Sequence, residues 1–161
     1  MRLDIPYGKG SISISIPDEN LAGVIRPNEV KIGNERDTII KAIQNPINSK
    51  NFEEFLSDAK DVLFIVNDGT RPTPTSKILD IIHDKFQEKD IKFIIATGVH
   101  RAPTEDELEF IFGKHLEYLR DKIHIHDAKK DEDMVFIGKS KNGTEMWVNK
   151  LGVEAHKIVI I

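Results

Sequence analysis

Cysteine is absent from this 161-residue chain, and aromatic residues make up only 7% of it. The absence of cysteine excludes disulfide bonds, thiolate catalysis and cysteine-ligated zinc or iron–sulfur centres. Long apolar runs are also missing, because residues 91–99 are interrupted by Lys92 and are too short to cross a bilayer. The first residues, Met-Arg-Leu-Asp-Ile-Pro, include no apolar segment, so we expect no signal peptide and a cytoplasmic protein.

The chain also lacks an excess of basic residues. It has 23 Lys and Arg against 27 Asp and Glu, a formal net charge of −4. Nucleic acid is therefore not an expected partner, and no basic amphipathic helix suggests a membrane surface. Hydrophobic residues make up 39% of the chain and charged residues 31%, as in folded globular proteins. The length predicts a single domain over residues 1–161.

The hydrophobic pattern predicts an α/β fold. Residues 11–16 alternate Ser and Ile, which is typical of a half-buried strand, and residues 2–5 are its expected hairpin partner. Continuous apolar runs then predict buried strands, and apolar residues at helical spacing predict helices between them. The expected strands are 62–66, 91–96, 122–126 and 157–161, and a late hairpin joins 134–137 to 145–148 around Asn142-Gly143. The expected helices are 34–44, 52–59, 74–88 and 104–112, the last of which opens with a capping box of Thr104 and Glu107. This order predicts a mostly parallel, Rossmann-like sheet with helices on both faces and an antiparallel hairpin at the N-terminus and another late in the chain.

A polar loop, residues 66–75, follows the first predicted buried strand. Ligands of open α/β sheets bind beyond the carboxyl ends of the strands, where this loop is expected. Arg71 offers a planar set of donors for a carboxylate or phosphate, and Asp68 could orient it. The alternative is a proline-rich turn in which Thr73 or Thr75 caps the next helix.

A second polar loop, residues 95–104, follows the next predicted strand. It contains Gly98, which permits close approach of a ligand, and His100, which exchanges protons near neutral pH. Arg101 adds a cation. Because both loops should lie at the same sheet edge, we expect one crevice suited to an anionic substrate whose proton or hydride is moved. The alternative is an incidental loop histidine.

A third strand end carries His124, His126 and Asp127, which could bind a divalent ion, although a polar strand edge also explains them. The patterns G-x-G-x-x-G, G-x-x-x-x-G-K-[ST] and G-x-S-x-G are all absent. The common dinucleotide, phosphate-loop and hydrolase motifs therefore give no support to those functions.

Two motifs, Asp-Gly-Thr-Arg-Pro-Thr-Pro at 68–74 and Thr-Gly-Val-His-Arg-Ala-Pro-Thr at 97–104, resemble the N-terminal domain of the nickel-dependent lactate racemase family. Residues 126–127, 138, 142–144, 148–150 and 154–156 resemble the segment that leads that domain toward its hinge. The resemblance implies a two-domain protein with its active site in the interdomain cleft. It also implies a nickel-pincer nucleotide cofactor and the interconversion of 2-hydroxy acid stereoisomers by removal and return of a hydride.

Carried over by position, the resemblance makes His100 one of two catalytic histidines and Arg71 the residue that grips the substrate carboxylate. Asp68 supports the motif loop, and Thr70 and Arg101 are further substrate-binding candidates. Gly69 is smaller than the residue often found at its position, which leaves the choice of hydroxy or sugar acid open.

The resemblance also implies a second catalytic histidine, a lysine that attaches the cofactor and a histidine that completes nickel coordination, all of which lie in the family downstream of the position of Ile161. We therefore expect an isolated domain or a short relative that binds no nickel tightly, is inactive alone and has the C-terminal domain of the same protein as its partner.

Two other functions fit the same loops. In a non-catalytic binding module, Arg71 and the following helix N-terminus would hold a nucleotide or phosphate. In a structural or assembly domain, the two loops would not share a crevice.

Overall fold

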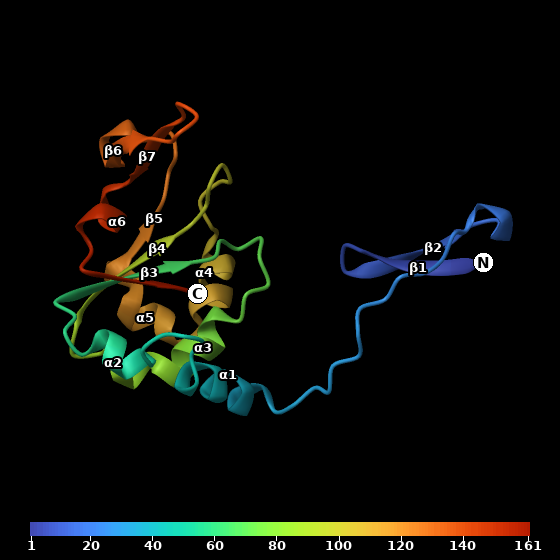
Figure 1. Ribbon diagram of the computed structural model, residues 1–161, viewed down its shortest axis with the longest axis horizontal. Coiled ribbons are helices and arrows are strands. Elements are labelled where there is room, and N and C mark those ends of the chain that lie inside the picture. The colour runs from blue at the N-terminus through green and yellow to red at the C-terminus, as the bar shows by residue number, and fades with distance from the viewer. The chain divides into compact units, whose positions relative to one another are not determined.

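The computed structural model describes residues 1–161, which form two compact units, Met1–Ile32 and Gly33–Ile161 (Figure 1). The first unit is a hairpin of β1 (Arg2–Tyr7) and β2 (Gly10–Ser15), followed by a 3-10 turn, Asp18–Asn20. Leu3 pairs with Ile14 and Ile5 with Ile12, so one face of the ribbon is apolar while the serines lie on the other. The predicted N-terminal hairpin is confirmed.

The second unit is built on a four-stranded parallel sheet of order β5-β4-β3-β8. Its strands are β3 (Asp61–Val66), β4 (Asp90–Ile95), β5 (Ile123–Ile125) and β8 (Lys157–Ile160). They correspond to the four strands predicted over residues 62–66, 91–96, 122–126 and 157–161, which confirms the parallel sheet. All four strands point the same way, so the loops after β3, β4 and β5 leave from one edge.

Six helices belong to this unit, and side-chain caps set the start of several of them. They are α1 (Glu35–Gln44), α2 (Phe52–Leu56), α3 (Thr75–Ile82), α4 (Glu105–Phe112), α5 (Leu116–Leu119) and α6 (Lys150–Glu154), with 3-10 turns at His83–Lys85, Gly113–His115, Arg120–Lys122 and Asp131–Asp133. Thr104 and Glu107 form the capping box expected for α4. Neither Thr73 nor Thr75 caps α3, so that expectation was wrong. The Thr75 hydroxyl instead donates to Asn67 Oδ1 at 2.6 Å.

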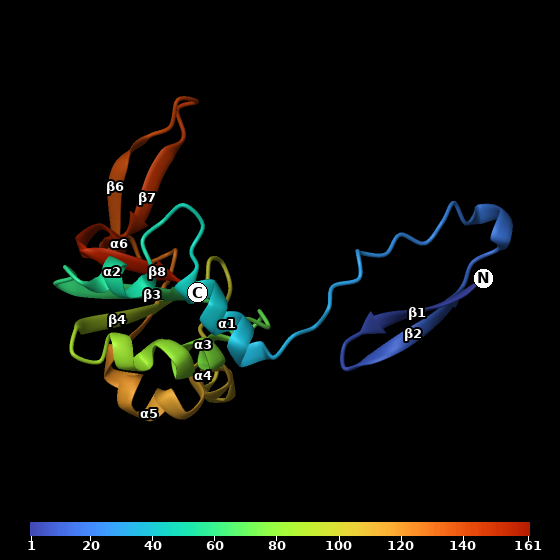
Figure 2. The ribbon, with the colours of Figure 1, turned by 60° about the horizontal axis from the view of Figure 1, so that its bottom comes forward.

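The hydrophobic core lies between the sheet and helices α3, α4 and α5, which cover the lower face of the sheet in Figure 2. Alternate residues of the two central strands face it, and Phe64 stacks on Phe93 with ring centroids 4.8 Å apart. On the opposite face, Leu151 of α6 lies beside Leu63 and Lys92. Helices therefore flank both faces, and the rigid centre of the sheet supports the three loops at its carboxyl edge.

A late hairpin projects from the sheet (Figure 2). Its strands are β6 (Met134–Lys139) and β7 (Glu145–Asn149), with an irregularity between Phe136 and Gly138. This hairpin is the one predicted from Asn142-Gly143, and Gly143 has a φ of +84°, which favours glycine. No helix in the structure has the length and apolar character needed to span a membrane.

Candidate functional site

The loops after β3, β4 and β5 are joined to one another by hydrogen bonds. The Ala96 N–H donates to the Val66 carbonyl at 2.9 Å, and the His126 N–H donates to the Ile95 carbonyl at 3.2 Å. The buried Thr97 hydroxyl donates to the His126 carbonyl. The three strand ends thus form one connected rim.

The first loop is organised by Asn67, which the sequence analysis did not single out. Its side-chain amide donates to the carbonyls of Asp68 at 2.8 Å and Arg71 at 3.1 Å. Its Oδ1 accepts from the hydroxyl of Thr75, which is fully buried. Asn and Asp frequently form such turn contacts, so the pair Asn67-Asp68 after a strand was the available signal.

Asp68 lies at the centre of the site and joins the first loop to the second. Its Oδ2 lies 2.5 Å from His100 Nδ1, and its Oδ1 accepts from the Thr70 N–H at 3.0 Å and the Thr70 hydroxyl at 2.7 Å. Asp68 is only 5% exposed, whereas 44% of the His100 side chain is exposed. Hydrogen bonds from Thr70 and His100 outweigh burial and lower the pKa of Asp68 from 3.8 to about 2. The carboxylate is therefore ionised at neutral pH.

An ionised Asp68 determines which His100 nitrogen carries a proton. A carboxylate only accepts hydrogen bonds, so His100 must present Nδ1–H to it. In the neutral imidazole this leaves the Nε2 lone pair free, and Nε2 has no hydrogen-bond partner in the structure. His100 is thus arranged to take a proton at Nε2 and to return it, with the resulting imidazolium stabilised by Asp68.

Arg101 is held by Glu107, which was predicted only as a helix cap. Its two terminal nitrogens each donate to a Glu107 carboxylate oxygen at 2.8 Å, and one also donates to the Ala102 carbonyl at 2.8 Å. Hydrogen bonds from Arg101 and from the Thr104 N–H lower the pKa of Glu107 to about 2. A Cβ on Gly69 would lie 2.5 Å from Glu107 Cγ and Cδ, so the first loop also packs directly against this ion pair.

Arg71 lies apart from this cluster. Its side chain is exposed and makes no hydrogen bond or ion pair, while its N–H donates to the Asp68 carbonyl at 3.2 Å. The Asp68 side chain does not orient Arg71, contrary to our expectation, because its two oxygens contact Thr70 and His100. The substrate-binding role of Arg71 stays a prediction.

Two hollows open at this edge, and both are lined by His100 and Arg101. The smaller, of about 200 Å³, also includes Asp68, Gly69 and Thr70 from the first loop. The larger, of about 600 Å³, lies between residues 98–102 and residues 125–129. Four of the five predicted site residues, all but Arg71, therefore line a common hollow, so the two loops share a crevice. Arg71, whose guanidinium was expected to face the same crevice as His100, lines neither hollow.

The third strand end contributes His126, Asp127 and Lys129 to the larger hollow. His126 Nδ1 lies 3.3 Å from the side-chain amide nitrogen of Asn149. The structure contains no group of three or more His, Cys, Asp or Glu side chains that could hold a metal ion. His124 is exposed on β5, and His126 lines the hollow without it.

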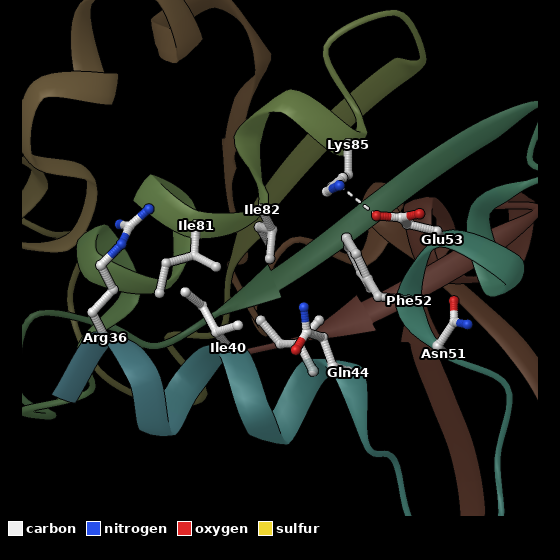
Figure 3. A pocket seen from close by; sticks show the side chains of 10 residues that line it. Arg36, Ile40, Gln44, Asn51, Phe52, Glu53, Ile81, Ile82 and Lys85 are labelled. Carbon is white, nitrogen blue, oxygen red and sulfur yellow. Dashed lines mark hydrogen bonds and ion pairs between the residues drawn. The ribbon is translucent and has the colours of Figure 1, made fainter. Parts of the chain in front are cut away.

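A separate cavity of about 380 Å³ lies between α1, α2 and α3 (Figure 3). Isoleucines of α1 and α3 and Phe52 line it together with polar and charged side chains, among them the ion pair of Lys85 with Glu53. It contains none of the predicted site residues and no histidine.

Comparisons with known proteins identify the family to which this chain is similar. Residues 7–161 match the family described as lactate racemase N-terminal domain. The chain is 33% identical over 170 residues to a lactate racemase of Thermoanaerobacterium thermosaccharolyticum and 31% identical over 163 residues to one of Lactiplantibacillus plantarum. Each alignment covers 98% of this chain and 38% of the relative, so the chain spans well under half the length of these proteins.

Two solved structures are similar. The lactate racemase apoprotein from T. thermosaccharolyticum superposes with a TM-score of 0.81 at 32% identity, covering 99% of this chain and 38% of that one. A Thermotoga maritima protein superposes with a TM-score of 0.57 at 20% identity, covering 78% of this chain and 32% of that one, which shows a shared fold alone.

Proposed function

This chain belongs to the lactate racemase N-terminal domain family, and on that premise we propose that it is the N-terminal domain of a two-domain racemase or epimerase acting on a 2-hydroxy acid. The observation that carries the proposal is the Asp68–His100 pair, which leaves an unpartnered imidazole nitrogen beside a hollow lined by both motif loops.

The acid/base step of the proposal is assigned to His100. Its Nε2 takes the proton of the substrate hydroxyl as the carbon–hydrogen bond is cleaved, and gives a proton back when the opposite stereoisomer forms. Asp68, at 2.5 Å from Nδ1, stabilises the imidazolium between these events and fixes the plane of the ring. Asp68 thus acts as a positioning residue rather than as a direct substrate contact.

Substrate binding is assigned to polar side chains of the two motif loops. Arg71 has a guanidinium without a protein partner, which suits a carboxylate. Thr70 Oγ1 donates to Asp68, so its oxygen retains acceptor capacity toward a ligand. Arg101 is neutralised by Glu107 and would contribute N–H donors more than net charge.

The family resemblance implies a nickel-pincer nucleotide, and we propose that its attachment lysine and its nickel-coordinating histidine lie in the remainder of the two-domain protein. When bound, such a cofactor supplies the hydride acceptor and donor. We assign it to the remainder of the two-domain protein, and we propose that this chain alone is inactive. The cytoplasmic location also stays a prediction.

Replacement of His100 by Ala in the two-domain protein tests the proposal. We expect racemisation of lactate, the default substrate, to fall by a factor of about 10²–10⁴, the range typical of a lost general acid/base. His124→Ala is the matched control, because His124 is exposed on β5 and has no hydrogen-bonding role. Racemisation at the normal rate by the His100 variant would end the proposal. Tight nucleotide binding by the isolated chain in calorimetry would favour the phosphate-binding module instead.

A further inference from the structure

A second imidazole, that of His126, lines the larger hollow together with His100. His126 follows the last residue of β5, and its backbone is fixed by hydrogen bonds to Ile95 and Thr97. Its Nδ1 lies 3.3 Å from Nδ2 of Asn149, the last residue of the late hairpin, whereas its Nε2 has no partner. The ring is therefore held on one side and open on the other.

The orientation of the Asn149 amide follows from the helix that it begins. Asn149 Oδ1 accepts from the Leu151 N–H at 3.0 Å as the N-cap of α6. Because the oxygen is used there, the NH₂ group is the part that faces His126. An NH₂ group only donates, so His126 Nδ1 must accept and carries no proton. Protonation of Nδ1 would place two donors against each other, and rotation of the amide would leave the Leu151 N–H unsatisfied.

We propose that His126 is a ligand-contacting residue of this hollow, held by Asn149 as a neutral imidazole that donates from Nε2–H to an anionic oxygen of the ligand. Lys129 also lines the hollow, and Asp127 Oδ1 accepts a hydrogen bond from the Lys129 N–H at 2.9 Å. Arg101 is paired with Glu107. The donors available here favour binding of an anionic oxygen, either from the carboxylate of a hydroxy acid or from a phosphate group.

This assignment deepens the proposed function and rests on it for the identity of the substrate. The two histidines of the hollow are in opposite tautomers, His100 with an accepting Nε2 and His126 with a donating Nε2. A 2-hydroxy acid needs both, because its hydroxyl donates and its carboxylate accepts. His126 is thereby a binding residue, and the proton transfer remains with His100.

The tautomer is tested by nitrogen-15 nuclear magnetic resonance of this chain with labelled histidine, above the pH at which imidazoles titrate. We expect His126 to be protonated at Nε2 in the unmodified chain. In Asn149→Asp the new carboxylate still caps α6 but accepts from His126, so the tautomer should change to Nδ1–H. Asn149→Ser is the control, since Ser retains the cap and removes the donor without supplying a carboxylate. A His126 protonated at Nδ1 in the unmodified chain, or an unchanged tautomer in Asn149→Asp, would overturn the assignment.

The ligand is tested in the same spectra by titration with lactate and, separately, with inorganic phosphate. Movement of the His126 Nε2 signal with lactate alone assigns the carboxylate, and movement with phosphate alone assigns the phosphate. If neither probe moves the His126 Nε2 signal while the tautomer is as expected, the binding role is refuted.

In the two-domain protein, His126→Leu should raise KM about 10–100-fold with kcat little changed, and His126→Gln, which retains a donor, should recover part of the loss. A fall in kcat with KM unchanged would contradict a binding role. Complete absence of racemisation in the unmodified protein would refute the proposed function and leave the tautomer result standing.

Discussion

Asp68→Asn should remove a pH-dependent part of the free energy of unfolding. The pKa of Asp68 is lowered from 3.8 to about 2 in the folded chain. A carboxyl whose pKa is lower in the folded than in the unfolded state stabilises the fold above its unfolded pKa, and this stabilisation is lost as the pH falls through the folded pKa. The window for Asp68 therefore runs from about pH 4 down to about pH 2.

The magnitude follows from the same shift. A change from 3.8 to about 2 corresponds to roughly 2 kcal/mol at neutral pH. Because 44% of the His100 side chain is exposed, solvent screening reduces the expected loss to about 1–2 kcal/mol. The lowered pKa of Asp68 comes first from the Thr70 hydrogen bond and then from His100, so the pH-dependent loss in Asp68→Asn reports on the charge that both contacts stabilise.

Urea unfolding followed by circular dichroism at a series of pH values measures this effect. At neutral pH the midpoint of the variant should fall by about 0.5–1 M, and the two stability curves should converge as the pH approaches the folded pKa. Glu88→Gln, at an exposed carboxylate without a partner, is the control and should leave the curve unchanged. Parallel curves for Asp68→Asn and the unmodified chain over the whole range would refute the ionised Asp68–His100 pair.

Three further outcomes are expected. Arg71→Ala in the two-domain protein should weaken substrate binding by about 2–3 kcal/mol, as for a charge-assisted hydrogen bond, and an unchanged KM for lactate would count against its assigned role. Gly69→Ala should destabilise the chain by about 1–3 kcal/mol in urea unfolding, because its Cβ would lie 2.5 Å from Glu107 Cγ and disturb the pair with Arg101; an unchanged midpoint would show that the loop yields freely. Phe64→Ala should cost about 3–5 kcal/mol by the same assay, because Phe64 is fully buried between Phe86 and Phe93, and a much smaller loss would mean that the core collapses around the vacancy.

The central strands of the sheet could be predicted from the sequence because they are apolar runs bounded by polar loops, whereas β5 alternates Ile and His. The helix boundaries were harder to predict from the sequence. The pattern predicted a helix over 74–88, but α3 ends at Ile82 and a 3-10 turn follows. Phe86 packs into the core from beyond that turn and is only 1% exposed. The helical spacing of Phe86 thus predicts its burial correctly but not its secondary structure, since tertiary packing determines the backbone conformation there.

The gathering of the site at one edge was also predictable, because it follows from the direction of parallel strands. The pairing within it was not. Asp68 was expected to orient Arg71, three residues away, but its carboxylate contacts His100, 32 residues away. Glu107 was identified as a cap, and its second role with Arg101 depends on how the loop after β4 folds over α4. Side-chain partners across loops are set by the packing of the loops, which spacing along one chain does not specify.

The contacts across these loops suggest why the site should respond as a unit. The loop after β3 is held internally by Asn67, and the loop after β4 by the pair of Arg101 with Glu107. At the level of side chains the two loops meet at the Asp68–His100 hydrogen bond and at the close approach of Gly69 to Glu107. Protonation of Asp68, or a side chain at position 69, therefore acts on both loops at once. Substitutions of Asp68 and His100 should accordingly be non-additive in stability, since either one removes the same hydrogen bond.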